Sequence, residues 1–224
     1  MNILCAVAHQ LELDPFKAKY SGVEQFNTGF GNLYQLARDG KDLNLIRTGI
    51  GLDSADKTLE QALRFLATDG ITPDLILNFG TCGAIHPERR VGDLIVGTGV
   101  VMDEMPELRL DEKWRTRFQE YLKFQDKQAI PGIIYSTEKA VADDRTRHRI
   151  SHETHAQIVE MECYSLAQIA KENNIPLLSV KYISDNADEF LMKDFLANVN
   201  EAMTELSDII VGFIESLKSA PDSH

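Results

Sequence analysis

The stretch Met161–Asp185 reads MECYSLAQIAKENNIPLLSVKYISD. Its first part, Met161–Asn173, places apolar residues every three or four positions, which is the spacing of an amphipathic helix. Its second part, Leu177–Ile183, is a short apolar run that ends at Ser184-Asp185 and is typical of a buried strand. A helix followed directly by a buried strand predicts an α/β fold with a mixed or mostly parallel sheet.

The same alternation continues along the rest of the chain. Short apolar runs bounded by turn residues predict further strands at Met1–Ala8, Leu43–Arg47, Leu75–Phe79, Asp93–Val101 and Gly132–Ser136. Helical spacing is found between and after them, at Ser54–Asp69, Leu110–Lys123 and Phe195–Leu217. A hairpin is predicted for Gln25–Thr28 and Gly31–Ala37. We expect one domain over residues 1–218, followed by a frayed tail at 219–224.

The charge of the chain limits its partners. It has 224 residues, with 23 Lys and Arg against 35 Asp and Glu, so its formal net charge is −12. A nucleic-acid polymer needs a positive surface, and this balance argues against one as a partner. A small ligand is compatible with the same charge, because a local pocket can oppose the charge of the whole molecule.

Cysteine usage and hydropathy bear on the compartment. Cys5, Cys82 and Cys163 are odd in number and widely spaced, which fits neither a disulfide framework nor a zinc ribbon. We therefore expect buried thiols and a reducing compartment. Residues 1–14 lack the basic start of a signal peptide, and no apolar run approaches the roughly 20 residues that span a bilayer. The chain is predicted to be cytoplasmic, without a membrane partner.

Ligands of open α/β sheets bind beyond the carboxyl ends of strands, so the residues that follow the predicted strands are the candidates for a site. Gly49-Ile50-Gly51 is either a tight strand-to-helix turn or a close approach of backbone to ligand. It lacks the third glycine of a dinucleotide-binding fingerprint, which argues against an oxidoreductase of that type. Gly80-Thr81-Cys82-Gly83 offers backbone N–H groups and a hydroxyl, but Cys82 has no partner base nearby in sequence.

Acidic residues follow two of the predicted strands, and two more lie at the start of a predicted helix. Glu160 and Glu162 form either a charged helix turn in solvent or a site in which a carboxylate accepts hydrogen bonds from a diol. Asp185 follows a buried strand, where it either caps a helix or acts as a general acid with a raised pKa. Glu12 follows the first strand.

Taken together, these segments resemble the nucleoside phosphorylase/nucleosidase superfamily, and within it the 5′-methylthioadenosine/S-adenosylhomocysteine nucleosidase family. The resemblance rests on Val159-Glu160-Met161-Glu162, on Ile183-Ser184-Asp185-Asn186-Ala187-Asp188, and on Asn78-x-Gly-Thr-x-Gly. It covers residues 1 to 217 and implies a three-layer α/β/α sandwich with a twisted, mixed and partly closed central sheet. It also implies a homodimer. We expect no cofactor, and the six histidines show no metal-ligand spacing.

The resemblance implies a role for each matching residue. Asp185 corresponds to the acid that protonates purine N7, and Ser184 to the residue that orients it. Glu12 corresponds to the carboxylate that positions and deprotonates the attacking water. Glu162 and Met161 correspond to the contacts with the ribose. The other residues predicted to contact the substrate are Thr81, Gly80, Glu160, Val141 and His9.

The implied reaction is hydrolysis of the N-glycosidic bond of a purine nucleoside, within methionine salvage. Phosphorylases of the superfamily place an Arg where Asn78 stands, so water is favoured over phosphate as the nucleophile. Three alternatives remain open: a nucleosidase for another purine nucleoside such as futalosine, a phosphorylase, and a non-catalytic nucleoside-binding protein on the same fold.

The sequence departs from the family pattern at several positions. Lys181 stands where the family has an Arg, which keeps the charge but loses the planar fork. Residues 136–141 replace the pattern that sandwiches adenine, and the loop before Phe195 is about three residues shorter than in the family. His9 faces the 5′ side of the ligand or has a structural role. The basic run Arg145–Arg149 is either a solvated helix face or a grip for an anionic substrate.

Overall fold

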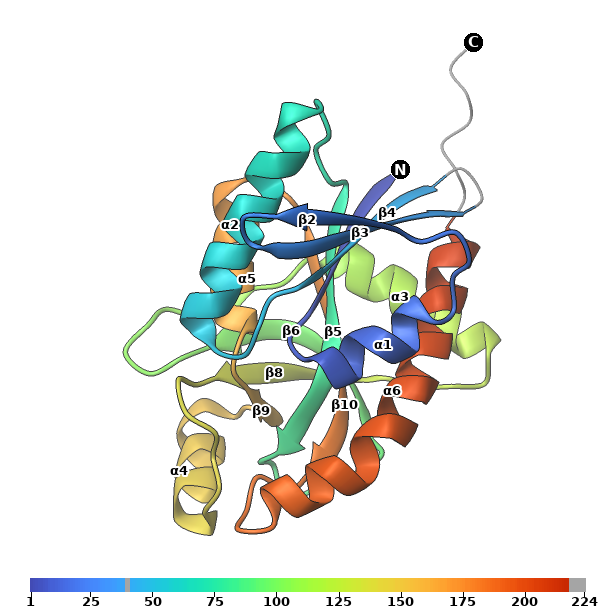
Figure 1. Cartoon of the computed structure of the whole chain (residues 1–224). Coiled ribbons are helices and arrows are strands. Elements are labelled where there is room, and N and C mark those ends of the chain that lie inside the picture. The colour runs from blue at the N-terminus through green and yellow to red at the C-terminus, as the bar shows by residue number, and fades with distance from the viewer. Residues whose placement is uncertain (39–40, 218–224) are drawn as a thin grey trace.

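The computed structural model describes residues 1–38 and 41–217 (Figure 1). Its sheet contains β1 (Asn2–Val7), β2 (Glu24–Thr28), β3 (Gly31–Arg38), β4 (Lys41–Arg47), β5 (Leu75–Ala84), β6 (Leu94–Val101), β7 (Leu108–Arg109), β8 (Ile130–Ser136), β9 (Ile158–Glu160) and β10 (Leu177–Asp185). The helices are α1 (Gln10–Lys17), α2 (Leu52–Thr68), α3 (Glu112–Phe124), α4 (Asp144–Thr154), α5 (Cys163–Glu172) and α6 (Leu191–Ser216). The tail predicted at 219–224 lies outside the described residues.

The sheet is mixed, as predicted. Its strands lie in the order β10-β6-β8-β9-β5-β1-β4-β3-β2, with β7 paired to β6. The central strand β1 pairs in parallel with β4 and β5, and buried parallel strands are continuous apolar runs, which is why this strand could be predicted. At the edge, β2 and β3 form the predicted antiparallel hairpin, and the exposed polar residues of β2 suit an edge strand.

Strand β10 closes part of the sheet into a ring. It pairs in parallel with β5 and antiparallel with β6. From β5 the ring continues through β9 and β8 back to β6. The strands β1, β4, β3 and β2 extend from β5 as an open sheet. This arrangement confirms the prediction of a partly closed sheet.

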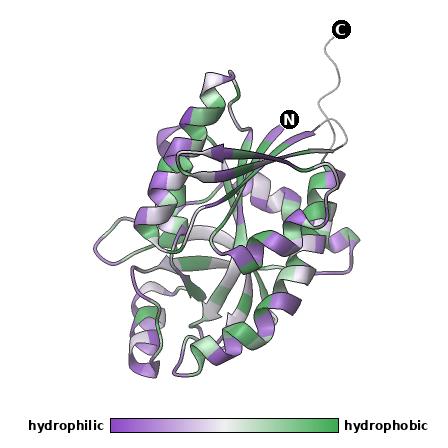
Figure 2. Ribbon diagram, viewed as in Figure 1, coloured by the Kyte–Doolittle hydropathy of each residue, from purple (hydrophilic) through white to green (hydrophobic). Residues whose placement is uncertain are grey.

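Helices cover both faces of the sheet, which confirms the predicted three-layer sandwich (Figure 1). Along β1, Ile3, Cys5 and Val7 belong to the core beneath α1, α3 and α6, whereas Leu4 and Ala6 belong to the core beneath α2 and α5. Figure 2 shows hydrophobic and hydrophilic residues alternating around the helices. Among the described residues, no helix has both the length and the apolar character needed to cross a bilayer.

The glycine-rich segment Gly80-Thr81-Cys82-Gly83, predicted to follow a strand, is part of that strand. β5 continues past its predicted end to Ala84. A Cβ atom at Gly80 would lie 2.7 Å from Oε1 of Glu12, and one at Gly83 would lie 2.8 Å from Oδ1 of Asp185. These glycines therefore allow two carboxylates to approach the strand rather than allowing the chain to turn.

Other elements around this region differ from the prediction. Helix α1 was not predicted, because it has only eight residues and contains Pro15. Helix α6 begins at Leu191 rather than Phe195, because Asp188 precedes its first turn: Phe190 N donates to Asp188 Oδ1 at 2.9 Å, and Leu191 N donates to Asp188 O at 3.0 Å. Three-residue β9 was also missed, and α5 begins after it, at Cys163.

Candidate active site

A pocket of ≈ 320 Å³ lies where β1, β5, β9 and β10 end. Of the predicted site residues, it is lined by His9, Glu12, Thr81, Val141, Glu160, Met161, Glu162, Ser184 and Asp185. The remaining one, Gly80, lies directly behind the carboxylate of Glu12. The sequence did not predict the other lining residues, which are Ala8, Ile50, Cys82, Gly83, Thr137, Ala140, Val159, Leu191, Met192 and Phe195.

His9 and Glu12 are joined by a capping box at the start of α1. His9 Nδ1 accepts a hydrogen bond from Leu11 N at 3.0 Å, and Glu12 Oε2 accepts one from His9 N at 3.0 Å. This reciprocal pattern fixes the first turn of the helix and the place of Glu12. Because Nδ1 is the acceptor, the neutral imidazole carries its proton on Nε2. His9 therefore has a structural role while it also lines the pocket.

The carboxylate of Glu12 accepts four hydrogen bonds. Oε1 accepts from Thr81 N at 2.7 Å and from Thr81 Oγ1 at 2.8 Å, and Oε2 accepts from Ala8 N at 3.1 Å and from His9 N at 3.0 Å. A carboxylate has about four acceptor sites, so a water bound here takes the place of one donor. Three of the donors are backbone amides, whereas the Thr81 hydroxyl can rotate. Thr81 is thus the donor that can yield to a water molecule.

Glu162 is buried at the start of α5 and faces the loop before α2. Its Oε1 accepts a hydrogen bond from Gly51 N at 2.8 Å. Among the described residues, no donor is bonded to its Oε2. Burial, followed by repulsion from Glu160, raises the pKa of Glu162 to about 7, although Lys181 and the Gly51 N–H act in the opposite direction. The charge of this carboxylate therefore changes near neutral pH.

Glu160 is a structural carboxylate, although it reaches the pocket wall. It accepts hydrogen bonds from the Ser136 hydroxyl, from Cys163 N at 3.0 Å and from Glu162 N at 3.2 Å. Its Oε2 also lies 3.2 Å from Nζ of Lys181. These partners saturate the carboxylate, so it anchors the start of α5 rather than exposing a free acceptor to a ligand.

Lys181 is a buried cation of β10. Burial alone would lower the pKa of Lys181, but Glu160 and Glu162 reverse this effect and hold it above its usual value. Its ion pair is with Glu160, and Glu12 exerts a weaker electrostatic effect on it. The lysine thus compensates the acidic charge behind the pocket.

Asp185 ends β10 with a buried carboxyl group. Oδ1 accepts a hydrogen bond from Ala187 N at 2.9 Å, and Oδ2 accepts one from the Ser184 hydroxyl at 2.9 Å. Burial raises the pKa of Asp185, and these two hydrogen bonds oppose the rise. Ser184 therefore contacts the carboxyl group of Asp185, and the raised pKa suits a proton donor.

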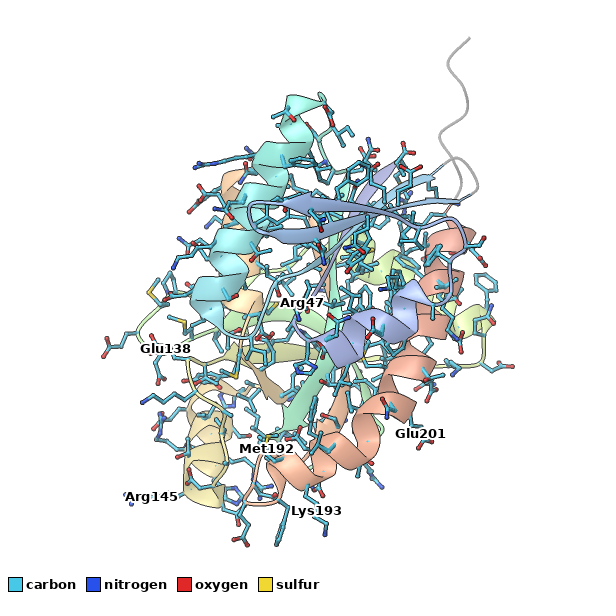
Figure 3. The ribbon with its side chains drawn as sticks, viewed as in Figure 1. Arg47, Glu138, Arg145, Met192, Lys193 and Glu201 are labelled. Carbon is cyan, nitrogen blue, oxygen red and sulfur yellow. The ribbon has the colours of Figure 1, made fainter. Side chains whose placement is uncertain are left out.

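The opposite part of the pocket is apolar. Phe195 of α6 packs its ring edge against His9, with the ring centroids 6.1 Å apart. Ile50 and Met192 are 58% and 61% exposed and lie at the mouth, and Figure 3 places Met192 at the start of α6. Val141 adds a buried aliphatic wall. A ligand that fits both parts carries hydroxyl groups toward the carboxylates and an apolar portion toward these side chains.

Among the described residues, neither Lys nor Arg lines the pocket. Asn78 points into the sheet instead: its Nδ2 donates to Ala6 O at 3.1 Å, and its Oδ1 accepts from Ser179 Oγ at 2.8 Å. Cys82 lies in the wall, but burial holds its pKa well above the usual value, so it is a thiol and not a nucleophilic thiolate. The described residues also include no group of three or more His, Cys, Asp or Glu arranged to hold a metal ion.

All of these residues lie between residues 2 and 215, which match the family model of the Phosphorylase superfamily. The chain belongs to this superfamily. A curated relative is the 5′-methylthioadenosine/S-adenosylhomocysteine nucleosidase of Buchnera aphidicola subsp. Acyrthosiphon pisum (strain APS). It is 26% identical over 193 residues, which cover 79% of this chain and 81% of the relative.

Two solved structures show how closely the fold follows the superfamily. The S-adenosylhomocysteine nucleosidase from Streptococcus pyogenes, in complex with 5-methylthiotubericidin, has a TM-score of 0.89 at 21% identity and covers 98% of both chains. The native futalosine hydrolase of Helicobacter pylori has a TM-score of 0.88 at 20% identity, covering 97% of this chain and 98% of that one. At these identities the likeness establishes the fold alone, and the TM-scores of the two structures differ by only 0.01.

Part of the apolar wall of this superfamily member could have been found from the sequence. Leu191 lies four residues before Phe195, so the helical spacing already extends α6 to the pocket. Ile50 stands between two glycines at a strand end, a segment that was a candidate for ligand contact. No comparable signal marks Thr137 or Ala140, which reach the pocket through the course of the loop after β8.

Proposed function

We propose that this member of the Phosphorylase superfamily is a purine nucleoside N-ribohydrolase, which acts on a nucleoside of the 5′-methylthioadenosine/S-adenosylhomocysteine type. The observation that carries the proposal is the convergence of Glu12, Glu162 and Asp185 on one pocket, to which the described part of the chain contributes no cationic side chain. The name of the Buchnera relative, a 5′-methylthioadenosine/S-adenosylhomocysteine nucleosidase, supports the same activity and substrate type.

Asp185 acts as the general acid. Its raised pKa keeps a proton available closer to neutral pH, and that proton passes to N7 of the purine. The C1′–N9 bond then breaks, and its electron pair moves to the base, which leaves as the neutral purine. The ribose gains oxocarbenium character at the same time, as in other glycosidic cleavages.

Glu162 and Glu12 act on the sugar side. The ionised Glu162 accepts hydrogen bonds from the 2′- and 3′-hydroxyls, with Gly51 N–H holding one of its oxygens in place. Glu12 binds a water after the Thr81 hydroxyl rotates away. The water oxygen bonds to C1′, and its proton passes to Glu12. The products are the free purine and a 5-substituted ribose.

The charge of the pocket favours water over phosphate as the nucleophile. A phosphate dianion needs cationic donors, whereas this pocket presents carboxylates, and the charge of Lys181 is committed to Glu160. A neutral or protonated nucleoside suits these surroundings. A phosphorolytic reaction in the same pocket would bring phosphate next to Glu12 and Glu162, which is electrostatically unfavourable.

The test is product identity. The purified protein is incubated with 5′-methylthioadenosine, S-adenosylhomocysteine, inosine and futalosine, with and without phosphate, and the products are separated by chromatography. We expect release of the free base without phosphate, fastest with one of the first two nucleosides. A sugar 1-phosphate that forms only with phosphate would identify a phosphorylase, and binding without release would identify a nucleoside-binding protein.

A futalosine-type nucleoside is the second candidate substrate. The aromatic pattern that sandwiches adenine in the family is replaced here, and the pocket wall after β8 consists of Thr137, Ala140 and Val141. The futalosine hydrolase fold also fits the chain as well as the nucleosidase fold does. Release of base from futalosine but from neither adenine nucleoside in the panel favours this candidate.

The remaining proposals concern the state of the protein in the cell. We propose that residues 1–218 form one domain, since a single sheet connects both cores, and that two copies form a homodimer. Exposed apolar side chains near the pocket mouth, including Ile50, Met192 and Leu196, offer a contact surface for a second copy.

Three buried free cysteines fit a cytoplasmic protein in methionine salvage. Sedimentation equilibrium tests the dimer, and cell fractionation tests the compartment.

A further inference from the structure

Side chains of α4 and α6 that do not line the pocket hold the backbone on both sides of Asp185. From α4, Arg147 Nη1 donates to the carbonyl oxygen of Asn186 at 3.0 Å. From α6, Asn198 Nδ2 donates to the carbonyl oxygen of Ser184 at 2.7 Å. Neither Arg147 nor Asn198 lines the pocket. The residues before and after the acid are thus fixed by side chains that a ligand does not contact.

The turn held by Arg147 determines the surroundings of the carboxyl group. Ala187, directly after Asn186, has φ +51°, a left-handed conformation that a non-glycine residue adopts only when its surroundings enforce it. In this conformation Ala187 N donates to Oδ1 of Asp185 at 2.9 Å. Ala187 is fully buried in a small core with Val141, Ile150 and Val159. Packing and the Arg147 hydrogen bond therefore act on the same turn.

Arg147 differs from the other arginines of its helix. Its side chain is 21% exposed, and Nη2 forms an ion pair with Asp144 at 2.8 Å, one turn earlier on α4. That pair aims the guanidinium at Asn186. Arg149, in contrast, is about half exposed and pairs with Glu153, and Arg145 is exposed on the outer side of α4 (Figure 3). The solvated helix face expected for this basic run is thus found at Arg145 and Arg149, whereas Arg147 is committed to the turn.

We propose that Arg147 is a positioning residue for Asp185: it fixes the Asn186–Ala187 turn, so that Ala187 N–H occupies Oδ1 and the transferred proton is carried by Oδ2. This inference rests on the proposed function, in which Asp185 is the acid. Oδ2 also accepts a hydrogen bond from the Ser184 hydroxyl at 2.9 Å, and this hydroxyl has a second acceptor in the carbonyl oxygen of Cys82 at 3.3 Å. When the hydroxyl turns to that carbonyl, Oδ2 can direct its proton into the pocket.

Loss of the hydrogen bond from Arg147 to Asn186 should change the pH dependence of the reaction. The Ala187 N–H bond favours the ionised carboxylate, whereas Asp188 of the turn and Asp194 of α6 disfavour it. Cys82 of β5 faces the group as a neutral thiol. A loosened turn weakens the N–H bond and leaves the two acidic residues in place. The pKa of Asp185 therefore rises.

The experiment compares Arg147→Met, Arg147→Lys and the control Arg145→Met, with circular dichroism and thermal unfolding to establish that each is folded. We expect Arg147→Met to lower kcat by about 10-fold to 100-fold through misplacement of the acid, with KM unchanged and the basic limb of the pH profile at higher pH. Arg147→Lys keeps one donor and should recover part of the loss. Arg145→Met should behave as the unmodified protein.

A second measurement separates this inference from the proposed function. The ¹³C resonance of the Asp185 carboxyl group is titrated in the unmodified protein and in Arg147→Met, which requires no turnover. A higher pKa of Asp185 in Arg147→Met supports the positioning role of Arg147 even if no nucleoside is hydrolysed. The same titration curve in both proteins, or an unchanged kcat and pH profile in an active enzyme, overturns it and leaves the assignment of Asp185 as the acid intact.

Discussion

Nζ of Lys181 lies 3.2 Å from Oε2 of Glu160, and both side chains are almost completely buried. Three carboxylates of the pocket region, Glu12, Glu160 and Glu162, act on this one cation. Glu160 has the direct contact, so Glu162 receives only part of the compensation and keeps a raised pKa. The ion pair therefore influences both the stability of the fold and the charge of the proposed ribose site.

Removal of the cation should destabilise the protein. Lys181→Met leaves the carboxylate of Glu160 buried without its counter-charge, and we expect a loss of about 3–5 kcal/mol in the free energy of unfolding. Denaturant titration followed by circular dichroism measures it. The double variant Glu160→Gln/Lys181→Met removes both charges and should recover part of the loss. A single variant as stable as the unmodified protein would contradict the role of the pair.

Substrate binding should depend on pH through Glu162. Its pKa of about 7 means that the carboxylate loses its charge as the pH falls through neutrality. A neutral carboxyl group is a weaker acceptor for the ribose hydroxyls, so KM should rise below about pH 7 and level off above it. Steady-state kinetics between pH 5.5 and 8.5 tests this. Glu162→Gln should bind weakly at every pH, and a persistent pH dependence of KM in that variant would assign the effect to another group.

Asp185→Asn should separate binding from chemistry. Asparagine keeps the shape and one acceptor but has no acidic proton, so kcat should fall by about 10²- to 10⁴-fold while nucleoside binding is retained. Stopped assays of base release and calorimetric titration measure the two quantities. Glu189→Gln, at an exposed position of the same turn, is the matched control and should keep full activity. Undiminished turnover of Asp185→Asn would rule out its role as the acid.

Gly80→Ala should displace the carboxylate of Glu12. The added methyl group would lie 2.7 Å from Oε1 of Glu12, so the carboxylate must move away from its backbone donors. We expect a lower kcat together with a loss of stability, since φ at Gly80 is +159°, a value that residues with a side chain rarely adopt. Gly31→Ala serves as the control, because its φ of +123° is also positive and its added Cβ has no atom within 4 Å. Equal kinetics of the two variants would show that the position of Glu12 is not critical.

Much of the architecture was predictable because buried parallel strands leave long apolar runs in the sequence. The pairing of Glu160 with Lys181 was not, because the partners lie on different strands and meet only through the closure of the ring. The sequence left open whether Glu160 and Glu162 form a solvated helix turn or a diol-binding site, and the structure shows both residues buried. The hydrogen bond from Arg147 to Asn186 could not be predicted either, since its acceptor is a backbone carbonyl, which has no signature in sequence.

The closure of the ring also bears on when the site comes into being during biosynthesis. Lys181 is paired with Gly80, which lies 101 residues earlier in the chain (181 − 80). Contacts over such separations form late compared with local ones. Because β10 carries both Lys181 and Asp185, a nascent chain that has already assembled β1, β4 and β5 still lacks its acid and its internal counter-ion. Onset of catalysis in a cell-free translation reaction would therefore mark the docking of β10.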